Sequence, residues 1–329
     1  MDYRSVGVDV AEADKLVQWL KKKSSLSSCS RVLSGIGAYS GLFQAVFPDM
    51  DEPCISASVD GVGTKLQLAV HFKRYVEVGQ DLVAMCVNDL ICSGAKPLFF
   101  MDYYACAQLL QKPAREFLTG VQKACEQSHC YLLGGETAEM PDSYTGLHFD
   151  CAGFALGVVD RAKILGAHKV EVGDRLIGVS SSGFHSNGFS LLRKIFQSDI
   201  SLWEEELLKP TALYVSLSLE LFKIKGLKAI AHITGGGMDN LLRVLPKKTA
   251  AAINIWNIPK PFMEVKRRTG MDLLELMKVL NCGIGLIVVI SAKDVNQIGQ
   301  LVKSKGFEVI DLGVVVSKKE QAPSWYIHS

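Results

Sequence analysis

The sequence lacks a long apolar run, a strong charge bias and a Cys-x-x-Cys pair. No apolar segment approaches the roughly 18 residues that a membrane-spanning helix requires. The 36 Lys and Arg residues nearly balance the 34 Asp and Glu residues, so the formal net charge is +2 and neither a nucleic-acid nor a membrane partner is expected. The sequence begins with acidic residues where a signal peptide would be basic and apolar, so a cytoplasmic location is expected.

The nine cysteines are typical of reduced thiols and not of a zinc site. Their number is odd, and most of them lie in apolar stretches. Cys125 and Cys130 have no His or Cys partner at the spacing of zinc ligands, so no zinc site is expected there. We interpret the cysteines as reduced thiols that pack in the core.

The length and composition predict a globular protein of two domains. The chain has 329 residues, of which 48% are hydrophobic and 21% charged. One hydrophobic core rarely organises so long a chain. A charged connector at 166–174 suggests a boundary near His168, so we predict domains at 1–168 and 169–329.

Strand-like and helix-like segments alternate in both halves, which predicts an α/β (α+β) fold class. Helices are predicted at 11–23, 81–93 and 114–128, and strands at 54–59, 97–104, 149–159, 175–180 and 283–290. A further strand ends at 134–137, and a helix and a strand follow between 292 and 316.

Three familiar sites can be excluded by the spacing of their motifs. GIGAYSG at 35–41 misses the dinucleotide fingerprint by one position, and DGVGTK at 60–65 is not a Walker sequence. In SSGFHSNG, at 181–188, the glycines are one residue too far apart for the nucleophile elbow of a serine hydrolase.

The polar residues of the first half still suggest a metal and phosphate site. Oxygen ligands suit Mg²⁺ that bridges phosphates, and the candidates are Asp60, Asp81, Asn88, Asp89 and Glu136. Any one carboxylate alone is more simply explained as the cap of a turn or helix. Their joint occurrence with glycine-bearing segments favours the site, whereas Lys65 could equally bind a phosphate or extend along a helix.

The second half carries two polar glycine loops, SSSGFHSNGFS at 180–190 and HITGGG at 232–237. Backbone N–H groups and hydroxyls in such loops can bind an anion, although a capping loop with an incidental His185 is the simpler explanation of the first one alone. Together the two halves predict an ATP-dependent enzyme whose site lies between its domains.

Many of these motifs, in this order, resemble one family, phosphoribosylformylglycinamidine cyclo-ligase of purine biosynthesis. The resemblance spans almost the whole chain and rests on Tyr3 with GVD at 7–9, GIGAYSG at 35–41, DGVGTK at 60–65, GQDLVAMCVNDL at 79–90, GAKPLFFMDYYA at 94–105, GGETAEMP at 134–141, SSGFHSNGFSLLRK at 181–194, HITGGG at 232–237 and NCGIG at 281–285. It implies a homodimer in which strands of the amino-terminal domain complete an intersubunit barrel, and a carboxy-terminal α/β domain.

The resemblance also implies the reaction. ATP would phosphorylate the formamide oxygen of formylglycinamidine ribonucleotide, and an amidine nitrogen would then close the ring of aminoimidazole ribonucleotide with release of ADP and phosphate. Mg²⁺ is the implied metal, and K⁺ is a second candidate cation.

Residue by residue, the resemblance assigns metal binding to Asp60, Asp89 and Glu136, of which Asp60 and Asp89 would act directly in catalysis. ATP contacts are implied for Gly35, Gly37, Lys65, Asp81, Asn88, Gly134, Gly135 and Glu136. Substrate contacts are implied for Ser182, His185, Ser186, Asn187, Thr234, Gly235 and Gly236. His185 is our hypothesis for the group that polarises the formamide or moves a proton.

The sequence departs from the family pattern at two places, a shortened MDNLLRVLP after HITGGG and Lys278-Val279-Leu280 before NCGIG. These departures concern substrate contacts near Asp239 and Lys278, not the ATP chemistry. Two alternatives stay open, a sister ATP-dependent phosphotransferase of the same superfamily and a nucleotide sensor without turnover.

Overall fold

The computed structural model describes residues 10–24 and 29–328, so Tyr3 and the segment 7–9 lie outside it. The chain divides into two compact units. Unit 1 comprises the chain up to Leu90 and Lys96–Arg161, and unit 2 comprises Ile91–Ala95 and the chain from Ala162 onward. The domain limits 1–168 and 169–329 and their assigned roles stay a prediction.

Unit 1 is built on a four-stranded sheet with the order β3-β6-β4-β5. Its strands are β3 (Pro53–Gly61), β4 (Lys96–Cys106), β5 (Tyr131–Glu139) and β6 (Phe149–Asp160), and its helices are α1 (Val10–Lys23), α2 (Leu66–Phe72), α3 (Val76–Cys92) and α4 (Gln111–Gln127). A small hairpin, β1 (Val32–Ser34) and β2 (Leu42–Phe43), flanks the predicted glycine loop. Only β4 and β5, which α4 connects, run parallel, so the sheet is mixed.

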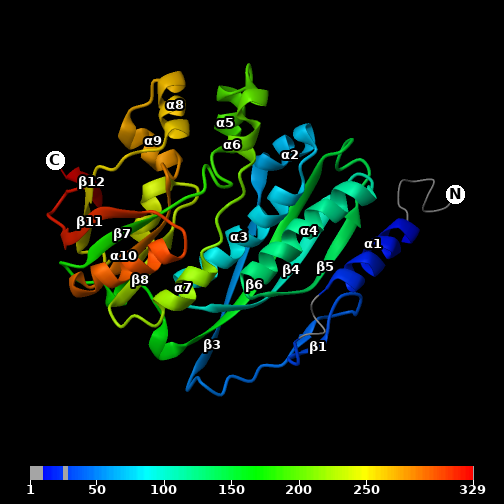
Figure 1. Cartoon of the computed structure of the whole chain (residues 1–329), viewed down its shortest axis with the longest axis horizontal. Helices are drawn as coiled ribbons and strands as arrows, with labels where there is room; N and C mark the ends of the chain where they lie inside the picture. The colour runs from blue at the N-terminus through cyan, green and yellow to red at the C-terminus, as the bar shows by residue number, and fades with distance from the viewer. Residues whose placement is uncertain (1–9, 25–28, 329) are drawn as a thin grey trace. The chain divides into compact units, whose positions relative to one another are not determined.

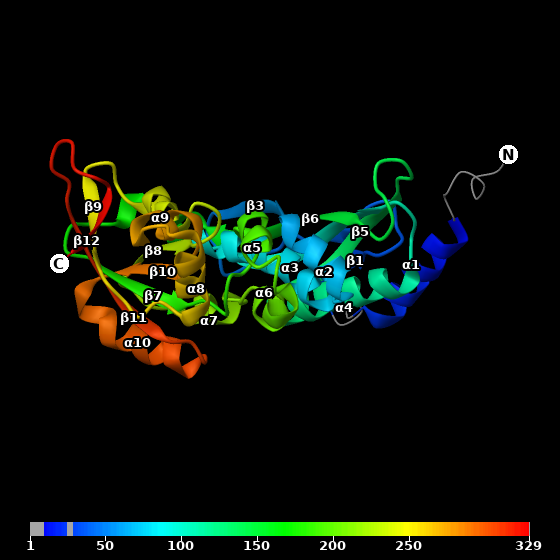
Figure 2. The ribbon, with the colours of Figure 1, turned by 90° about the horizontal axis from the view of Figure 1, so that it is seen from above.

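The two faces of this sheet differ. Figures 1 and 2 show α3 and α4 on the same side of the sheet, where the ring of Tyr104 on β4 lies 5.3 Å from that of Phe117 on α4. Along β3 the exposed side chains are apolar, since Ile55 and Val59 are 59% and 62% exposed. The part of the opposite face that β3 forms is therefore apolar and exposed in the single chain.

The helix predicted to begin at Asp81 begins five residues earlier, at Val76. Gly79, which resembles a helix breaker in the sequence, lies inside α3 and faces Gly120 of α4. A methyl group at Gly79 would collide with the backbone of α4, and one at Gly120 would collide with Val76. These glycines are thus contact positions that let two helices approach closely, and Asp81 lies within the helix instead of capping it.

Gly134 and Gly135 also lie elsewhere than predicted. They are inside β5, which pairs with β4 as far as Glu139, and they are not at its end. Gly135 is directly opposite Asp102, and a methyl group there would collide with the Asp102 carboxylate. The missing side chain makes room for a charged group within the sheet.

Unit 2 contains a six-stranded sheet with the order β12-β9-β11-β7-β10-β8. Its strands are β7 (Arg175–Ser180), β8 (Leu227–His232), β9 (Thr249–Asn254), β10 (Ile284–Ile290), β11 (Val309–Ser317) and β12 (Trp325–His328). Its helices are α5 (Phe189–Ile195), α6 (Glu204–Leu208), α7 (Val215–Leu221), α8 (Lys260–Thr269), α9 (Leu273–Val279) and α10 (Val295–Ser304). Every residue of β10 is buried, as its continuous apolar run predicted.

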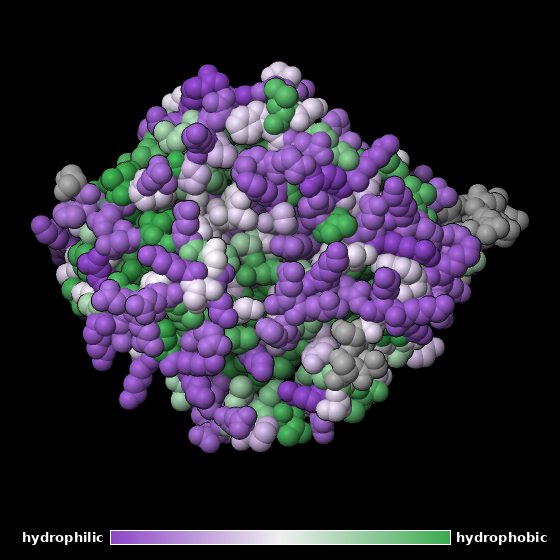
Figure 3. Space-filling view, viewed as in Figure 1, coloured by the Kyte–Doolittle hydropathy of each residue, from purple (hydrophilic) through white to green (hydrophobic). Residues whose placement is uncertain are grey.

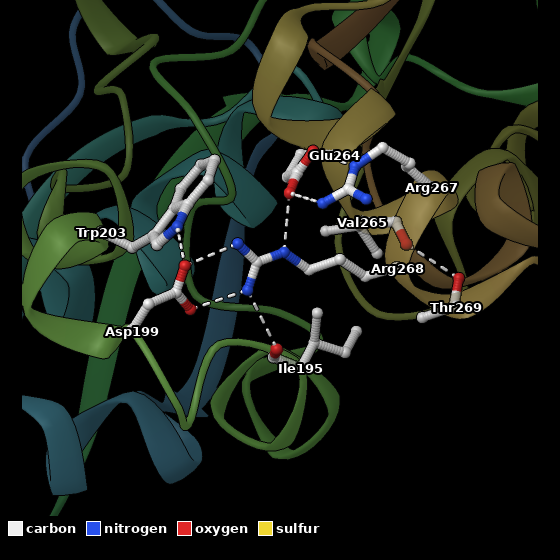
Figure 4. Close-up of polar contacts among 8 residues, drawn as sticks. All are labelled: Ile195, Asp199, Trp203, Glu264, Val265, Arg267, Arg268 and Thr269. Carbon is white, nitrogen blue, oxygen red and sulfur yellow. Dashed lines mark hydrogen bonds and ion pairs between the residues drawn. The ribbon is translucent and has the colours of Figure 1, made fainter.

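One polar cluster fixes α8 to the segment after α5. Figure 4 shows the Arg268 guanidinium between Asp199 and Glu264. Its two terminal nitrogens donate to the Asp199 carboxylate at 2.7 and 2.6 Å, and its Nε donates to Glu264 at 2.7 Å. The guanidinium also lies 4.6 Å from the centre of the Phe196 ring. The cluster joins segments about 70 residues apart through a charged and an aromatic contact.

None of the described helices is both long and apolar enough to cross a membrane. The face drawn in Figure 3 is mostly hydrophilic, with smaller hydrophobic patches between the polar side chains.

Candidate functional site

A pocket of about 410 Å³ lies within unit 1 and collects several of the predicted ATP residues. It is bounded by α1, by the loop that carries Gly37, by β4 and β5, and by Leu118 of α4. Its lining residues are Ala13, Leu16, Val17, Leu20, Ile36, Gly37, Ala38, Tyr39, Asp102, Leu118, Gly135, Glu136 and Thr137. The pocket is large enough for a small organic ligand and is mostly apolar.

The Gly37 loop is held next to a lysine. Gly37 has a φ of +84°, which suits glycine, and a methyl group there would collide with the end of the Lys21 side chain. Lys21 is an exposed residue of α1, so its ammonium group lies beside the loop and close to solvent. Sequence reasoning overlooked Lys21 because it belongs to a run of three lysines that is typical of a solvated helix end.

Asp102 is the second residue that sequence reasoning overlooked. It lies in the middle of β4, is 6% exposed and lines the pocket. Burial raises the pKa of its carboxyl group to about 7. The sequence does indicate Asp102, because it is an aspartate inside the apolar run PLFFMDYYA. Burying a charged side chain there lowers the stability of the fold, so such a residue is a candidate for a functional role.

Lys65 and Asp81, both predicted to contact ATP, form an ion pair in the interior. Their charged atoms are 2.7 Å apart, and both side chains are fully buried. Burial lowers the pKa of Lys65, and the adjacent Asp81 charge opposes that effect. Asn88, two turns along α3 and on the same face as Asp81, is also fully buried. The pair attaches the DGVGTK segment to α3 in the interior of unit 1.

The three predicted metal ligands do not form one cluster. Asp60 lies on the edge strand β3 and Glu136 on the opposite edge strand β5, so three strand spacings, about 14 Å, separate their backbones. No group of three acidic, His or Cys side chains suited to a metal ion occurs among residues 10–24 and 29–328. Asp60 lies next to α3, which carries Asp89, since the Cys86 Sγ of that helix is 4.0 Å from the Asp60 carbonyl oxygen. The negative charges of Asp60 and Asp89 add to the effect of burial in raising the pKa of the Cys86 thiol.

In unit 2 the predicted polar loops start from the same end of the sheet. The last residue of β7, Ser180, pairs with Ile284 at the start of β10, and the last residue of β8, His232, pairs with Leu286. The loops after β7 and β8 and the NCGIG segment before β10 must therefore be neighbours. A contact of 3.4 Å between Asn187 Oδ1 and the Cβ position of Gly235 confirms that the first two loops meet.

The NCGIG segment supports the SSSGFHSNG loop through Asn281. The side-chain nitrogen of Asn281 donates to the Gly183 carbonyl at 2.9 Å, and its Oδ1 accepts from the Ser181 hydroxyl at 3.2 Å. In the second loop, Asn240 Nδ2 donates to the carbonyls of Gly235 and Gly237 at 3.1 and 2.9 Å. These asparagines were not predicted, because their hydrogen bonds join residues that only the fold brings together.

His185 has a different environment from the one that an open catalytic loop would provide. Its side chain is 1% exposed, and its Nε2 accepts a hydrogen bond from the Ser182 backbone N–H at 3.2 Å. The residue has a left-handed φ of +61°. A methyl group at Gly285 would collide with both the His185 and Tyr214 rings, so this glycine makes room for the two rings.

Residues around His185 and residues of the HITGGG loop are the ones that reach the surface. Ser182, Gly235 and Gly236 are exposed, and Ser186, Asn187 and Thr234 are half-buried. The buried Nδ2 of Asn187 has no hydrogen-bond acceptor in the described part of the chain. A buried amide donor of this kind suits a ligand that brings oxygen acceptors.

Two family models match the chain in succession. The amino-terminal domain of AIR synthase related proteins matches residues 44–159, and the carboxy-terminal domain matches residues 171–325. The chain is 40% identical to the phosphoribosylformylglycinamidine cyclo-ligase of Alkaliphilus oremlandii (strain OhILAs), over 97% of this chain and 98% of that protein. It is also 40% identical to the enzyme of the same name from Chromobacterium violaceum, over 96% and 95% of the two chains.

Solved structures with lower identity share the fold. Thiamine-monophosphate kinase from Stenotrophomonas maltophilia K279a superposes with a TM-score of 0.68 at 17% identity, over 97% of this chain and 96% of that chain. The hydrogenase maturation protein HypE in complex with ATP has a TM-score of 0.70 at 13% identity, over 96% and 90% of the two chains. At these identities the likeness is one of fold alone.

Proposed function

Because this chain belongs to the phosphoribosylformylglycinamidine cyclo-ligase family, we propose that it uses ATP to convert formylglycinamidine ribonucleotide into aminoimidazole ribonucleotide. The strongest support is the 40% identity to relatives of that name over almost the full length of both chains. The γ-phosphoryl group passes to the formamide oxygen, and an amidine nitrogen attacks the activated carbon. Phosphate then leaves as the ring closes, and a proton is lost.

The unit 1 pocket is our candidate for the ATP site. Gly37 and Gly135 line the pocket, and Gly35 and Gly134 are their near neighbours in the sequence. Lys65, Asp81 and Asn88 are buried, so we assign them to holding the DGVGTK segment in place rather than to direct contact. Lys21 is an additional candidate for phosphate binding, since its ammonium group lies against the Gly37 loop.

Asp60 and Asp89 are our candidates for holding Mg²⁺. Mg²⁺ is usually bound by one or two carboxylates together with phosphate oxygens, so the absence of a three-carboxylate cluster among the described residues is compatible with this choice. When bound, the ion would neutralise charge on the transferring phosphoryl group. Glu136, at the other edge of the sheet, would have to act at a separate position.

The loops of unit 2 are our candidates for the ribonucleotide site. Ser182, Ser186, Asn187, Thr234, Gly235 and Gly236 supply hydroxyl, amide and backbone donors at one end of the sheet. Phosphate and ribose oxygens are acceptors that such donors bind. His185 is buried beneath this loop, so we assign it a positioning role. Near-normal turnover by His185→Asn would support that role. Loss of turnover with intact substrate binding would support direct catalysis.

The uncovered apolar face of the unit 1 sheet suggests a homodimer. β3 is an edge strand, and its exposed side chains Ile55 and Val59 are apolar, as is the 44% exposed Phe154 on β6. Pairing such a face with a second copy would bury it and complete a barrel. Light scattering should give a dimer mass that Ile55→Asp reduces, while Leu202→Asp, at an 84% exposed position of unit 2, should leave it unchanged.

The function is tested by following ADP and the aminoimidazole product together. The purified chain with Mg-ATP should release ADP only when formylglycinamidine ribonucleotide is present, in equal amounts with product. Asn187→Ala should raise the KM for the ribonucleotide without changing that for ATP. Binding of ATP without substrate-dependent turnover would refute the proposal and favour a sensor or a sister phosphotransferase.

A further inference from the structure

The unit 1 pocket contains a buried carboxyl group without a matching cation. Asp102 lines the pocket and is 6% exposed, but none of the pocket's lining residues, all within the described part of the chain, is Lys, Arg or His. No ion pair is found for it among the described residues, in contrast to the equally buried Asp81. A buried carboxylate of this kind is costly unless a donor reaches it.

The residues next to Asp102 leave room for its carboxylate. A methyl group at Gly135 would collide with it, so the neighbouring strand leaves space at the one position where Asp102 needs it. The rest of the pocket wall is largely apolar, with Leu16, Leu20 and Leu118 among its residues. A largely apolar pocket with one buried carboxyl group fits a flat heterocycle that carries an N–H donor on its edge.

We propose that Asp102 accepts a hydrogen bond from the exocyclic amine of adenine and thereby selects adenine over guanine nucleotides. The proposal rests on the proposed function in one respect, the use of ATP. Adenine has an amine donor at the position where guanine has a carbonyl acceptor. A carboxylate therefore attracts the first base and repels the second, which gives selectivity through both a favourable and an unfavourable contact.

The Gly37 part of the pocket wall agrees with this assignment. Gly37 lines the pocket, and the Lys21 side chain reaches that glycine from the exposed side of α1. A nucleotide with its base at Asp102 would direct its phosphates toward an ammonium group close to solvent. The pocket therefore offers an acceptor to the base, and Lys21, which lies beside the pocket residue Gly37, offers a cation to the phosphates.

The test is a binding cycle with the full chain in the absence of the ribonucleotide. Calorimetry would compare ATP, GTP and the triphosphate of purine riboside, which has hydrogen in place of the amine. Wild type should bind ATP about 10- to 100-fold more tightly than either alternative, the range expected for a buried hydrogen bond to a charged group. Asp102→Leu should lose this advantage for ATP and bind the purine riboside triphosphate about as well as wild type does.

Two further variants keep the test interpretable. Asp102→Asn can turn its amide to donate to guanine, so its GTP affinity should rise about tenfold. Asp160→Asn is the matched control, because Asp160 is also buried in unit 1 but accepts from the Asp51 backbone N–H, so its nucleotide preference should equal that of wild type. Thermal unfolding would establish that each variant is folded.

The outcomes separate this inference from the proposed function. Equal losses for ATP and the purine riboside triphosphate in Asp102→Leu, or no loss, would overturn the assignment even if wild type forms the imidazole product. Adenine selectivity that depends on Asp102 in a protein without product formation would keep the assignment and refute the cyclo-ligase proposal. A wild type that does not bind ATP would refute both.

Discussion

Two buried aspartates of unit 1 differ in what surrounds them. Asp81 on α3 has the Lys65 ammonium 2.7 Å away, and both side chains are completely buried. Asp102 on β4 is almost as buried, yet the pocket that it lines has no Lys, Arg or His among its described lining residues. The first charge is neutralised within the protein, and the second is left for something that binds.

This difference separates a structural charge from a functional one. An ion pair in the interior is a fixed part of the fold, since removing either partner leaves the other charge buried and uncompensated. An unmatched carboxylate in a pocket lowers the stability of the empty protein, and ligand-binding sites are where such a cost is commonly retained.

The largest effect is expected from Lys65→Met. The substitution leaves the Asp81 carboxylate buried without its cation, and the free energy of unfolding should fall by about 3–5 kcal/mol. Urea unfolding monitored by circular dichroism would measure it. The double variant Lys65→Met/Asp81→Leu should recover much of the loss, and a single variant as stable as wild type would show that the pair has no structural role.

Asp102→Asn should instead raise the free energy of unfolding at alkaline pH. Burial raises the pKa of Asp102 from its usual 3.8 to about 7, so the folded state holds this proton more tightly than the unfolded state. The stability of wild type should therefore decline as the pH rises from about 4 to about 7, and the variant should lack this part of the decline.

At pH 8 the Asp102→Asn variant should consequently be more stable by about 1–2 kcal/mol, because the gain from removing the charge is partly offset by burying an amide. At pH 4 the two proteins should be nearly equal. Urea unfolding at a series of pH values would measure the difference, and a difference that does not depend on pH would show that Asp102 is already compensated.

Much of the fold follows from local patterns in the sequence. The strands β7 and β10 and most of α4 lie where alternation and apolar runs predicted them. The start of α3 could not be predicted, because Gly79 weakens a helix on its own and is favourable only where Gly120 of another helix meets it. Such a contact depends on the tertiary fold and leaves no mark on the local pattern.

The candidate site was predictable in its loops but less so in its charges. The SSSGFHSNG and HITGGG loops meet at one end of the sheet, as their motifs suggested. The sequence left Lys65 equally as a phosphate ligand or as a side chain extended along a helix, and only the fold reveals that it is buried against Asp81. Asp102 was missed for the same reason, since its importance comes from the lack of a cation around it.

Asp272 extends the comparison to an aspartate at the surface. It caps α9 by accepting a hydrogen bond from the Glu275 backbone N–H at 2.7 Å. Asp272→Ala should lower the free energy of unfolding by about 1 kcal/mol, and Asp272→Ser should retain most of the cap. Urea unfolding would compare the two variants, and equal losses would mean that the side-chain acceptor contributes nothing.

The smallest effect is expected at the Arg268 cluster (Figure 4), which is the solvent-accessible counterpart of the Lys65–Asp81 pair. Arg268→Gln removes the bonds to Asp199 and Glu264, whereas the matched control Arg267→Gln removes the same charge and only the bonds to Glu264. Thermal unfolding should show a lower Tm for Arg268→Gln than for Arg267→Gln. Because water and salt screen exposed charges, the gap should narrow in 1 M salt but not vanish, since stacking on Phe196 does not depend on salt. If salt did not change this difference in Tm, the contribution of Arg268 would come from stacking alone.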